Sequence, residues 1–424
     1  MIEQIYKAFL ESKGIERDTR NELQGKIYWA LKGERFDGNE FVNQALENGA
    51  VYAVTSDKKY KNHPKVFVVD DTLDALQKLA NYHRKKLAVP VIAITGSNGK
   101  TTTKELVRHV LSEKYKVTAT EGNLNNHIGV PLTLLNIKPD TDIAIVEMGI
   151  NHFGEMEQLC KIAEPDFGYI TSFGEAHLEF FGDLQGVIKA KTALYRFLES
   201  NNGVAFVNFD DPIQIEHTRN LKRFGFTYHQ VKEAQVKLIK KEHFPFNELE
   251  YKGTRIKSKL FGEFHFSNLG AAVAIGDFFG LSADEIKHGV EKYIPQNNRS
   301  QLLIINDLRI ILDAYNANPT SMKAALEGLS MLPGNKLAIL GDMFELGKKQ
   351  KEKHEEIVNL LKEKQIPAFL IGKIFGQTHT HEFIKGKFKN VEEFKKQINI
   401  FDLKDATILI KASRAMALEK ILDN

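Results

Sequence analysis

The sequence predicts an α/β protein with a mostly parallel central sheet, built as several domains. Short apolar runs alternate with segments of helical periodicity over most of the chain. One of these runs is followed by a glycine-rich turn and then by a helix, which is the setting of a phosphate-binding loop. The chain has 424 residues, and a usual domain of ~150 residues predicts about three domains.

The composition is that of an ordinary globular protein, with 42% hydrophobic and 27% charged residues. The net charge of +3 is too small to indicate a nucleic-acid partner or an anionic membrane surface. A single cysteine, Cys160, excludes an intrachain disulfide framework and a cysteine-based zinc site. The charged opening segment does not fit a secretory signal, and no apolar run approaches the ~18 residues of a membrane span. We therefore expect a cytoplasmic protein without membrane insertion.

The first domain boundary is expected near Lys86. KVFVVD (65–70) is rich in β-forming residues, and leucines then recur at helical spacing until Pro90 ends the helix. A second boundary is expected near Asn298, after the Pro/Asn-rich segment YIPQNN (293–298). These boundaries divide the chain into residues 1–86, 87–298 and 299–424.

The two larger parts both have the pattern of alternating strands and helices. Residues 255–260 differ, because their alternation of apolar and polar side chains predicts a half-exposed antiparallel strand. The mixed-charge run 347–365 predicts a solvated helix. Continuous apolar runs predict strands buried on both faces of parallel sheets at VIAIT (91–95), IAIV (143–146), YITS (169–172), VAFVN (204–208), RIILD (309–313), LAIL (337–340), AFLIG (368–372) and TILIK (407–411).

The glycine-rich turn is the strongest chemical signal in the sequence. Glycines let backbone N–H groups turn toward phosphate oxygens, and the following helix adds the positive end of its dipole. Lys100 would neutralise β/γ-phosphate charge, and the Thr101 hydroxyl would bind Mg²⁺. The alternative is a strand–helix turn with an exposed lysine. The predicted nucleotide loop consists of Gly96, Ser97, Asn98, Gly99, Lys100, Thr101 and Thr102.

Phosphoryl transfer also requires metal ligands. Glu147 directly follows the strand IAIV, so its carboxylate should lie at the carboxyl end of the sheet, where open α/β sheets bind ligands. His177 follows the next strand and could reach the same crevice. Taken alone, Glu147 could equally be a helix cap, and His177 could be purely structural.

Further short segments follow the loop GSNGKTTTKE (96–105) in a fixed order. Together they resemble the Mur ligases, the ATP-dependent amide-forming enzymes of peptidoglycan precursor synthesis. DAYNANP and GDMFELG favour the branch that adds D-alanyl-D-alanine to UDP-N-acetylmuramoyl-tripeptide. The matching segments are DTR (18–20), ALKGERFDG (30–38), NLNNHIGVPLTLL (123–135), VEMGINHFGEME (146–157), GEAHLEFFG (174–182), AKTALY (190–195), HFSNLGAA (265–272), DAYNANPTSM (313–322), LGDMFELG (340–347) and KASRAM (411–416).

The resemblance implies three domains: a small N-terminal α/β domain for the UDP-sugar, a central ATPase and a C-terminal Rossmann-like domain for the incoming amine. It implies that Thr101, Glu147 and His177 bind Mg²⁺, and that Lys191 is carbamylated and helps to hold a second Mg²⁺. Asn268, Arg299 and Asp313 would contact ATP. The implied substrate contacts are Thr19, Arg20 and Asp37 for UDP, Asn125 and Asn126 for the muramoyl-peptide, and Asn316, Asn318, Asp342 and Glu345 for the dipeptide.

The family reaction needs no protein nucleophile. The peptide carboxylate would attack the ATP γ-phosphate to form an acyl phosphate, which the amine of D-alanyl-D-alanine then attacks. We expect a monomer. One alternative is another amide ligase of the superfamily, such as the diaminopimelate- or lysine-adding enzyme or a folylpolyglutamate synthase. The other is a nucleotide-dependent switch that joins no substrates.

The sequence departs from the family pattern at a few positions. Tyr28 and Trp29 replace a phenylalanine and a small apolar residue. Asn39 stands where histidine is common, and Ala412 where glycine often precedes Ser-Arg. These departures concern the UDP segment and the C-terminal loop and leave the phosphate loop unchanged.

Overall fold

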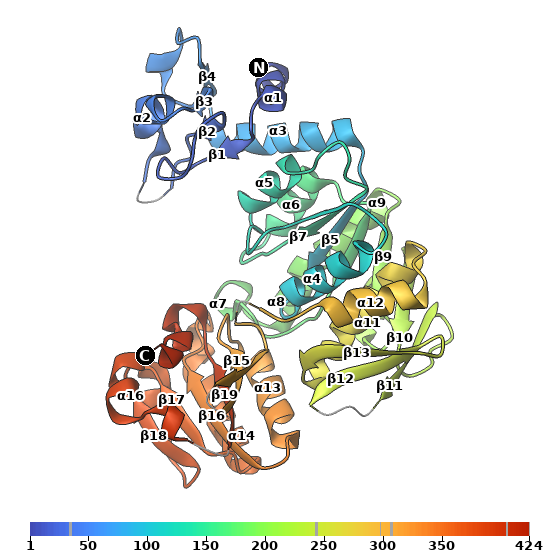
Figure 1. Cartoon of the computed structure of the whole chain (residues 1–424), viewed down its shortest axis with the longest axis vertical. Helices are drawn as coiled ribbons and strands as arrows, with labels where there is room; N and C mark the ends of the chain where they lie inside the picture. Colours follow the sequence, from blue (N-terminus) through green and yellow to red (C-terminus); the bar gives the residue numbers. More distant parts are fainter. Residues whose placement is uncertain (34–35, 242–244, 297, 306–307, 404–405, 424) are drawn as a thin grey trace. The chain divides into compact units, whose positions relative to one another are not determined.

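The computed structural model describes residues 1–33, 36–241, 245–296, 298–305, 308–403 and 406–423. It contains sheets of four, nine and six strands, most of whose neighbours are parallel (Figure 1). The prediction of an α/β fold with parallel-rich sheets is therefore confirmed. Within the described ranges, no helix is long and apolar enough to cross a membrane.

The four-stranded sheet is entirely parallel and follows the order of the chain. Tyr28 and Trp29, which depart from the family pattern, are fully buried in its second strand. The Tyr28 hydroxyl donates to the Gly38 carbonyl at 2.9 Å, and the Trp29 indole N–H donates to the Thr72 carbonyl at 2.7 Å. The elements are α1 (Ile2–Glu11), β1 (Ile15–Glu16), β2 (Ile27–Trp29), α2 (Val42–Glu47), β3 (Tyr52–Thr55), β4 (Val66–Val68) and α3 (Thr72–Leu87).

The nine-stranded sheet has the order β13-β12-β11-β10-β9-β8-β5-β7-β6. The pairs β6/β7, β9/β10 and β10/β11 are parallel, whereas β11/β12 and β12/β13 are antiparallel. The antiparallel strand predicted at 255–260 is confirmed within β13. The strands are β5 (Val91–Thr95), β6 (Val117–Ala119), β7 (Ile143–Glu147), β8 (Phe167–Ile170), β9 (Val204–Asn208), β10 (Lys222–Thr227), β11 (Val236–Lys241), β12 (Phe246–Tyr251) and β13 (Thr254–Phe261).

The helices of this part of the chain alternate with its parallel strands, as the sequence predicts. Strand β8 ends two residues before the predicted end at Ser172, because the Thr171 and Ser172 side chains bond the phosphate loop. The helices are α4 (Lys100–Leu111), α5 (Gly129–Leu135), α6 (Glu155–Ala163), α7 (Leu178–Phe181), α8 (Leu184–Lys191), α9 (Ala193–Ser200), α10 (Pro212–His217), α11 (Phe266–Phe278) and α12 (Ala283–Lys292).

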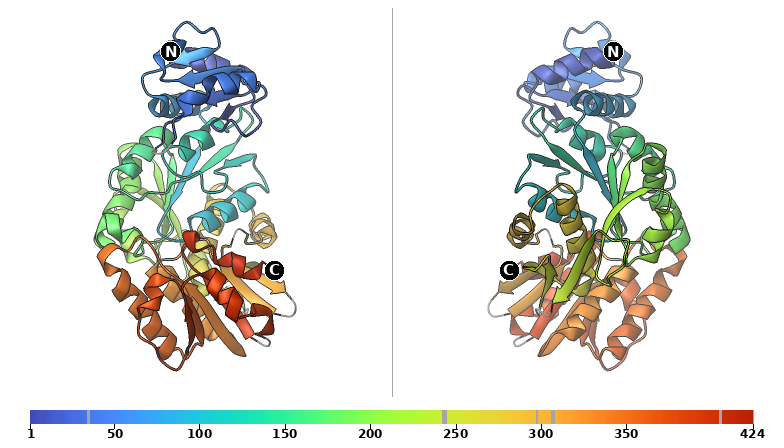
Figure 2. Two further views of the ribbon diagram at one scale, coloured as in Figure 1. Left: turned by 90° about the vertical axis from the view of Figure 1, so that its left-hand side faces the viewer. Right: turned by 90° about the vertical axis from the view of Figure 1, so that its right-hand side faces the viewer.

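The six-stranded sheet has the order β14-β15-β19-β16-β17-β18, and only its first pair is antiparallel. Helices cover both faces of this sheet (Figure 2). The elements are β14 (Gln301–Ile305), β15 (Leu308–Asp313), α13 (Pro319–Met331), β16 (Asn335–Gly341), α14 (Gln350–Glu363), β17 (Ala368–Ile371), α15 (Lys373–Gly376), β18 (Ile384–Phe388), α16 (Val391–Gln397) and β19 (Ala406–Lys411).

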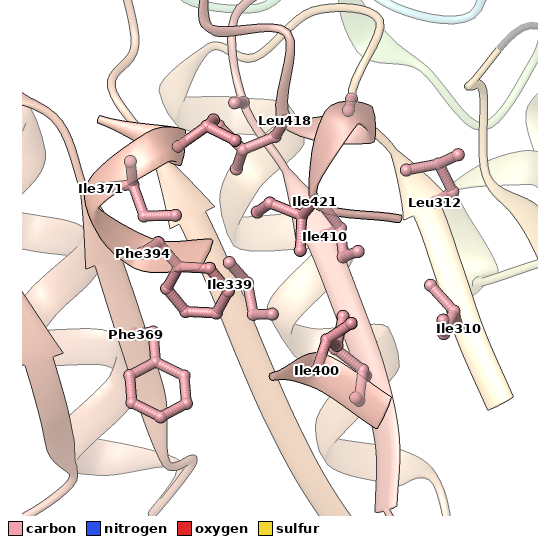
Figure 3. Packing of buried hydrophobic residues seen from close by; sticks show 14 of the residues in the cluster. Ile310, Leu312, Ile339, Phe369, Ile371, Phe394, Ile400, Ile410, Leu418 and Ile421 are labelled. Carbon is pink, nitrogen blue, oxygen red and sulfur yellow. The ribbon is translucent and has the colours of Figure 1, made fainter. Parts of the chain in front are cut away.

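One face of this sheet is closed by α16 and two C-terminal 3₁₀ turns. Ile339, Ile371 and Ile410 project from three neighbouring strands toward Phe394 of α16 and Ile421 (Figure 3). Each of these five side chains is at most 3% exposed. Burial of a branched or aromatic side chain contributes about 1.5–3 kcal/mol, so this cluster holds the strand ends of the sheet in fixed positions.

The mixed-charge run 347–365 forms helix α14, but the expectation that it is simply solvated was wrong. Lys353 is only 9% exposed and His354 is fully buried. Ile357 and Leu361 continue the same buried stripe at helical spacing. The helix is therefore amphipathic, and its buried face carries charge as well as apolar side chains.

Contacts divide the chain into two compact units. The predicted boundary near Lys86 lies in the last turn of α3, and the one near Asn298 lies beside two residues with positive φ, Asn298 and Ser300. The three-domain boundaries themselves stay a prediction. The first unit comprises Met1–Ala93, Tyr115–Ile150 and Gly154–Phe167, and the second comprises Ile94–Lys114, Asn151–Phe153 and Gly168–Asn424.

Arg84, in the last turn of α3, ties together three segments of the first unit. Its guanidinium donates to the carbonyls of Ala163 and Glu164 at 3.2 Å and to the Asp166 carboxylate at 2.7 Å. The same carboxylate accepts the backbone N–H of Val91, the first residue of β5. The Arg84 side chain is 9% exposed, so its loss would leave buried acceptors unpaired.

Arg84→Met should destabilise the first unit by about 2–4 kcal/mol, because a buried charged donor is removed from three acceptors. The matched control is the neighbouring Lys85→Met, whose ion pair with Glu164 is exposed and should contribute less than about 1 kcal/mol. Urea-unfolding midpoints of both variants measure the difference. Equal midpoints would show that Arg84 is not a structural tie.

Candidate active site

The predicted phosphate loop lies between β5 and α4, as the sequence requires. Gly96 and Gly99 have φ of 146° and 81°, which L side chains rarely adopt. A Cβ at Gly96 would lie 1.9 Å from Thr171 Oγ1, and one at Gly99 would lie 2.6 Å from Asn268 Oδ1. Glycine is therefore required at both positions by space as well as by conformation. The Lys100 ammonium donates to the Gly96 carbonyl at 2.7 Å.

The phosphate loop is held by the segment that follows β8. Ser97 N–H donates to the Ser172 carbonyl at 2.9 Å, and Asn98 N–H donates to Ser172 Oγ at 3.0 Å. Ser97 Oγ both donates to the carbonyl and accepts from the N–H of Gly174, each at 3.0 Å. These bonds fix the loop backbone before any ligand binds, which is the preorganisation that phosphate binding needs.

The DAYNANP segment also contacts the phosphate loop. Asn318 Nδ2 donates to Asn98 Oδ1 at 2.8 Å, and the reverse contact from Asn98 Nδ2 to Asn318 Oδ1 is 3.4 Å long. Asn318 also caps helix α13 by accepting the N–H of Ser321 at 2.8 Å. One predicted dipeptide residue is thereby positioned directly against the predicted nucleotide loop.

Two of the predicted magnesium ligands, Thr101 and His177, lie in the second unit, and one of them has a buried polar atom without a hydrogen-bond partner among the described residues. For Thr101 this atom is Oγ1. His177 Nδ1 is buried and lies 2.5 Å from a carboxylate oxygen of Glu345. This contact lowers the pKa of the Glu345 carboxyl. Both residues have left-handed backbones, with φ of 55° at His177 and 62° at Glu345.

The third predicted magnesium ligand, Glu147, ends strand β7 in the first unit and is 1% exposed. Its Oε1 accepts from Asn125 Nδ2 at 2.8 Å, whereas its Oε2 has no partner in the described part of the chain. An unpaired buried polar atom costs about 1–3 kcal/mol. The Thr101 hydroxyl and the Glu147 carboxylate therefore each have a buried oxygen atom without a partner in the described ranges, and oxygen atoms of this kind are the ligands that Mg²⁺ prefers.

Lys191 is 1% exposed at the end of helix α8. Burial and the nearby positive charge of Lys100 lower the pKa of its amine well below the ordinary value. Lys191 is therefore not an ordinary exposed helical lysine, and its amine is shifted toward the neutral, nucleophilic form.

Two residues from the last part of the chain, Arg299 and Asp313, are predicted to contact ATP, and a buried ion pair holds the Asp313 side chain in place. Lys411 Nζ lies 2.5 Å from the Asp313 carboxylate and is 3.2 Å from the Asn316 carbonyl, to which it donates. Asp313 also accepts the Ser300 N–H at 3.0 Å. The Arg299 guanidinium stacks on the Tyr315 ring at 3.5 Å from its centroid.

Asn268 lies beneath the phosphate loop. Its Oδ1 accepts from the Thr103 hydroxyl at 3.1 Å, so its Nδ2 faces His265 Nδ1 at 2.8 Å. This assignment makes Nδ1 the acceptor and places the imidazole proton on Nε2. Burial lowers the pKa of His265 to about 4, so the ring is neutral near pH 7.

The remaining predicted dipeptide residues differ in what their side chains already bind. The Asp342 carboxylate accepts the N–H groups of Ile374 and Phe375 at 3.0 and 2.9 Å, at the start of α15. Asn316 Oδ1 accepts the N–H of Ala317 at 2.9 Å. Glu345 faces His177, as described above. Of these three side chains, that of Glu345 contacts another predicted site residue, His177.

Asn125 and Asn126 fix their own loop in the first unit. Asn125 holds Glu147, whereas Asn126 Oδ1 accepts the N–H groups of Ile128 and Gly129 at 3.1 and 2.9 Å before α5. Direct contact of either side chain with the muramoyl-peptide stays a prediction.

The two predicted UDP segments meet near the end of β2. Burial, with the charges of Asp18 and Asp37, raises the pKa of Tyr28 to about 12. Arg20 pairs with Asp18 at 2.6 Å and lowers its pKa to about 2. The Thr19 carbonyl accepts from Asn48 Nδ2 at 3.5 Å.

The UDP-segment departure at Asn39 also has a structural explanation. The Asp37 carboxylate accepts from the Asn39 backbone and side chain at 3.0 and 2.6 Å. Asn39 Oδ1 in turn accepts from Thr55 and Ser56, so this residue fills a structural role.

Sequence reasoning missed three residues of this region: Lys411, Thr320 and Lys353. Lys411 follows an apolar strand directly, as Glu147 does, and that position was a usable signal. Lys353 shares a helix face with Ile357 and Leu361, a pattern that predicts burial. No local pattern marks Thr320, whose hydroxyl accepts the Glu175 N–H at 3.1 Å.

Comparison with known proteins identifies the family. The profile of the Mur ligase middle domain matches residues 94–276, and that of the Mur ligase, glutamate ligase domain matches residues 298–420. The UDP-N-acetylmuramoyl-tripeptide–D-alanyl-D-alanine ligase of Bacillus subtilis is 36% identical over 96% of this chain and 92% of its own length. This chain belongs to the Mur ligase family.

Solved Mur ligase structures have the same fold. A crystal structure of MurF from Acinetobacter baumannii is 30% identical, covers 100% of this chain and 97% of its own, and has a TM-score of 0.87. MurF from Thermotoga maritima, solved in complex with ADP, is 28% identical, covers 98% and 97%, and has a TM-score of 0.86. The resemblance noted from the sequence is confirmed, whereas the roles of individual residues stay predictions.

His265 should make the stability of this Mur ligase depend on pH. The pKa of the His265 imidazole is about 4 in the folded protein and about 6.5 in the unfolded chain. Between these two pH values the unfolded state binds a proton that the folded state does not bind. Stability is therefore lost as pH falls from 6.5 toward 4, by up to about 2 kcal/mol at pH 5.

His265→Asn removes this titration and should reduce the loss of unfolding free energy between pH 7 and pH 5. The exposed His217→Asn should keep the pH dependence of the unsubstituted protein. Urea unfolding at both pH values provides the measurement. Identical pH dependence in the two variants would contradict the buried neutral imidazole.

Proposed function

We propose that this chain is the ATP-dependent ligase that joins D-alanyl-D-alanine to UDP-N-acetylmuramoyl-tripeptide. The products are UDP-N-acetylmuramoyl-pentapeptide, ADP and phosphate, and the reaction belongs to peptidoglycan precursor synthesis. The observation that carries this proposal is the 36% identity to a ligase of that name across nearly the whole of both chains. The contact of the DAYNANP segment with the phosphate loop supports it.

The reaction proceeds by activation of a carboxylate. An oxygen of the peptide's terminal carboxylate attacks the γ-phosphorus of ATP, and ADP leaves. The amine of D-alanyl-D-alanine then attacks the acyl carbon, phosphate leaves, and the new amide nitrogen loses a proton. Lys100 and the N–H groups of the loop at Gly96–Thr102 stabilise the charge on the transferring group. Arg299, Asp313 and Asn268 orient the nucleotide.

Magnesium is held by Thr101, Glu147 and His177. The buried atoms Thr101 Oγ1 and Glu147 Oε2, which have no partner among the described residues, support the first two assignments. When bound, Mg²⁺ neutralises negative charge on the phosphates during transfer. Glu147 is oriented for this role by Asn125, and His177 by its strained loop.

Lys191 is carbamylated and supplies a carboxylate-like ligand for a second magnesium ion. Its neutral amine attacks CO₂ to form a carbamate and releases a proton. The buried position and the lowered amine pKa support the modification, because only the unprotonated amine reacts.

Substrates are divided among three domains at residues 1–86, 87–298 and 299–424. Thr19, Arg20 and Asp37 bind the UDP end, Asn125 and Asn126 the muramoyl-peptide, and the last domain binds the dipeptide. Within the dipeptide site, Glu345, Asn316 and Asn318 contact the substrate. Asp342 acts by holding α15, because its carboxylate already accepts two backbone N–H groups.

A single-amino-acid-adding ligase of the same superfamily is the nearer competing function, and a nucleotide-dependent switch is the more distant one. Purified enzyme with ATP, Mg²⁺ and UDP-N-acetylmuramoyl-tripeptide should release phosphate only when D-alanyl-D-alanine is added. Release with diaminopimelate, lysine or glutamate in its place would favour the first competitor. Release that is indifferent to any amine would favour the switch.

Lys100→Ala should lower the rate of this dipeptide-dependent phosphate release by at least about 100-fold, because a charge-stabilising donor is lost in the transition state. The exposed Lys138→Ala serves as the control and should be as active as the unsubstituted enzyme. Phosphate release is the readout for both. Full activity of Lys100→Ala would remove the phosphate loop from the mechanism.

The carbamate on Lys191 should be visible directly. Protein equilibrated with ¹³C-bicarbonate should give a carbamate carbonyl signal in the carbon NMR spectrum, and Lys191→Met should lose it. Lys189→Met, an exposed lysine on the same helix, should keep the signal. A signal that survives Lys191→Met, or that is absent from the unsubstituted enzyme, would contradict the modification.

A further inference from the structure

The segment that carries His177 is clamped between two parts of the second unit. We call residues 172–179 the histidine loop. On one side, Ser97 of the phosphate loop exchanges two hydrogen bonds with Gly174. On the other side, helix α13 is so close that a Cβ at Gly174 would lie 3.1 Å from Thr320 Oγ1, and the same Cβ would lie 3.2 Å from Asn98 Nδ2 of the phosphate loop. The histidine loop therefore has little freedom to move toward either neighbour.

An ion pair links the histidine loop to helix α14, with the lysine side chain largely buried and the glutamate side chain partly exposed. Lys353 Nζ of α14 lies 3.0 Å from a Glu175 carboxylate oxygen. The backbone N–H of Glu175 also donates to Thr320 Oγ1 at 3.1 Å. Both the side chain and the backbone of Glu175 are thus fixed by the helices, two residues before His177.

Lys353 has a second partner that holds it in place. Its ammonium is 3.0 Å from Glu356, whose other carboxylate oxygen is 2.7 Å from Lys323 of α13. The Lys353 side chain is 11% exposed, so its charge is largely removed from water. A buried lysine between two carboxylates is well oriented, and removing one member leaves the others without a partner.

The geometry of His177 depends on such support. Its φ of 55° is a strained conformation for a residue other than glycine, and its buried Nδ1 lies 2.5 Å from the Glu345 carboxylate. The anchors are at Ser97, Glu345 and the Lys353–Glu175 pair.

We propose that Lys353 is a positioning residue for the ligase reaction, whose ion pair with Glu175 sets the histidine loop so that His177 can bind the catalytic metal. The proposal rests on the function proposed above, and it adds a residue on α14 that does not touch the nucleotide. It assigns a functional role to a charged residue in a run that the sequence marks as solvent-exposed.

The test uses the full-length enzyme, with dipeptide-dependent phosphate release over a range of Mg²⁺ concentrations and, separately from activity, the affinity for Mg²⁺ in the presence of ADP measured by isothermal titration calorimetry, which should weaken in the variants that lose the ion pair. Lys353→Met should lower kcat about tenfold, and the Mg²⁺ concentration for half-maximal activity should rise at least about threefold, because a charge-assisted contact to the metal-binding loop is lost. Glu175→Gln should have the same effects and lies in the partly exposed loop, so it decides the outcome if Lys353→Met fails to fold. The exposed Lys351→Met on the same helix should match the unsubstituted enzyme.

A double variant separates a positioning pair from a merely structural lysine. If the two residues act through one contact, Lys353→Met combined with Glu175→Gln should impair kcat and raise the Mg²⁺ requirement no more than the more severe single variant. Additive losses in the double variant, a reduced kcat at unchanged Mg²⁺ requirement, or full activity of both neutral variants would each overturn the proposal. An unsubstituted enzyme that releases no dipeptide-dependent phosphate would instead refute the proposed function.

Discussion

The absence of space around two glycines of the phosphate loop is the constraint on which the rest of the site depends. Gly96 packs on Thr171 and Gly99 packs on Asn268, at distances that exclude a Cβ. Because the loop packs closely against both neighbours, contacts within the protein fix the orientation of its backbone N–H groups. The same packing brings Asn98 to Asn318 and Ser97 to Gly174, so the nucleotide loop, the histidine loop and the DAYNANP segment are positioned by one set of contacts.

The site concentrates features that a fold selected only for stability would avoid. Thr101 and Glu147 each bury a polar atom without a partner among the described residues, and each such atom costs about 1–3 kcal/mol. Lys191 is a buried amine whose charged form is disfavoured. Costs of this kind are expected where a protein is prepared for ligands that it does not itself contain. They are offset by cores such as the one around Ile339, Ile410 and Phe394 (Figure 3).

Most of the fold could be predicted from local pattern. Strands β5, β7, β9, β15, β17 and β19 were expected from apolar runs, and each lies where predicted within a residue or two. The errors have physical causes. Strand β8 ends early because the hydroxyl groups of Thr171 and Ser172 donate hydrogen bonds to the Asn98 carbonyl. Charged residues on the buried face of helix α14 pair with opposite charges on other segments: Lys353 pairs with Glu175, and Glu356 pairs with Lys323 of α13. The sequence alone does not show which charged residues will be neighbours in the folded chain.

By itself, the sequence determined the phosphate loop and its strand–helix setting, because glycine spacing, Lys100 and Thr101 act within one continuous segment. It also determined the family, because many short motifs keep their order along the chain. Only the tertiary structure decided that Lys191 is buried, that Lys411 pairs with Asp313, and that Lys353 reaches Glu175. Those facts arise from contacts between residues far apart in the chain, and burial and charge pairing become defined only when the segments pack.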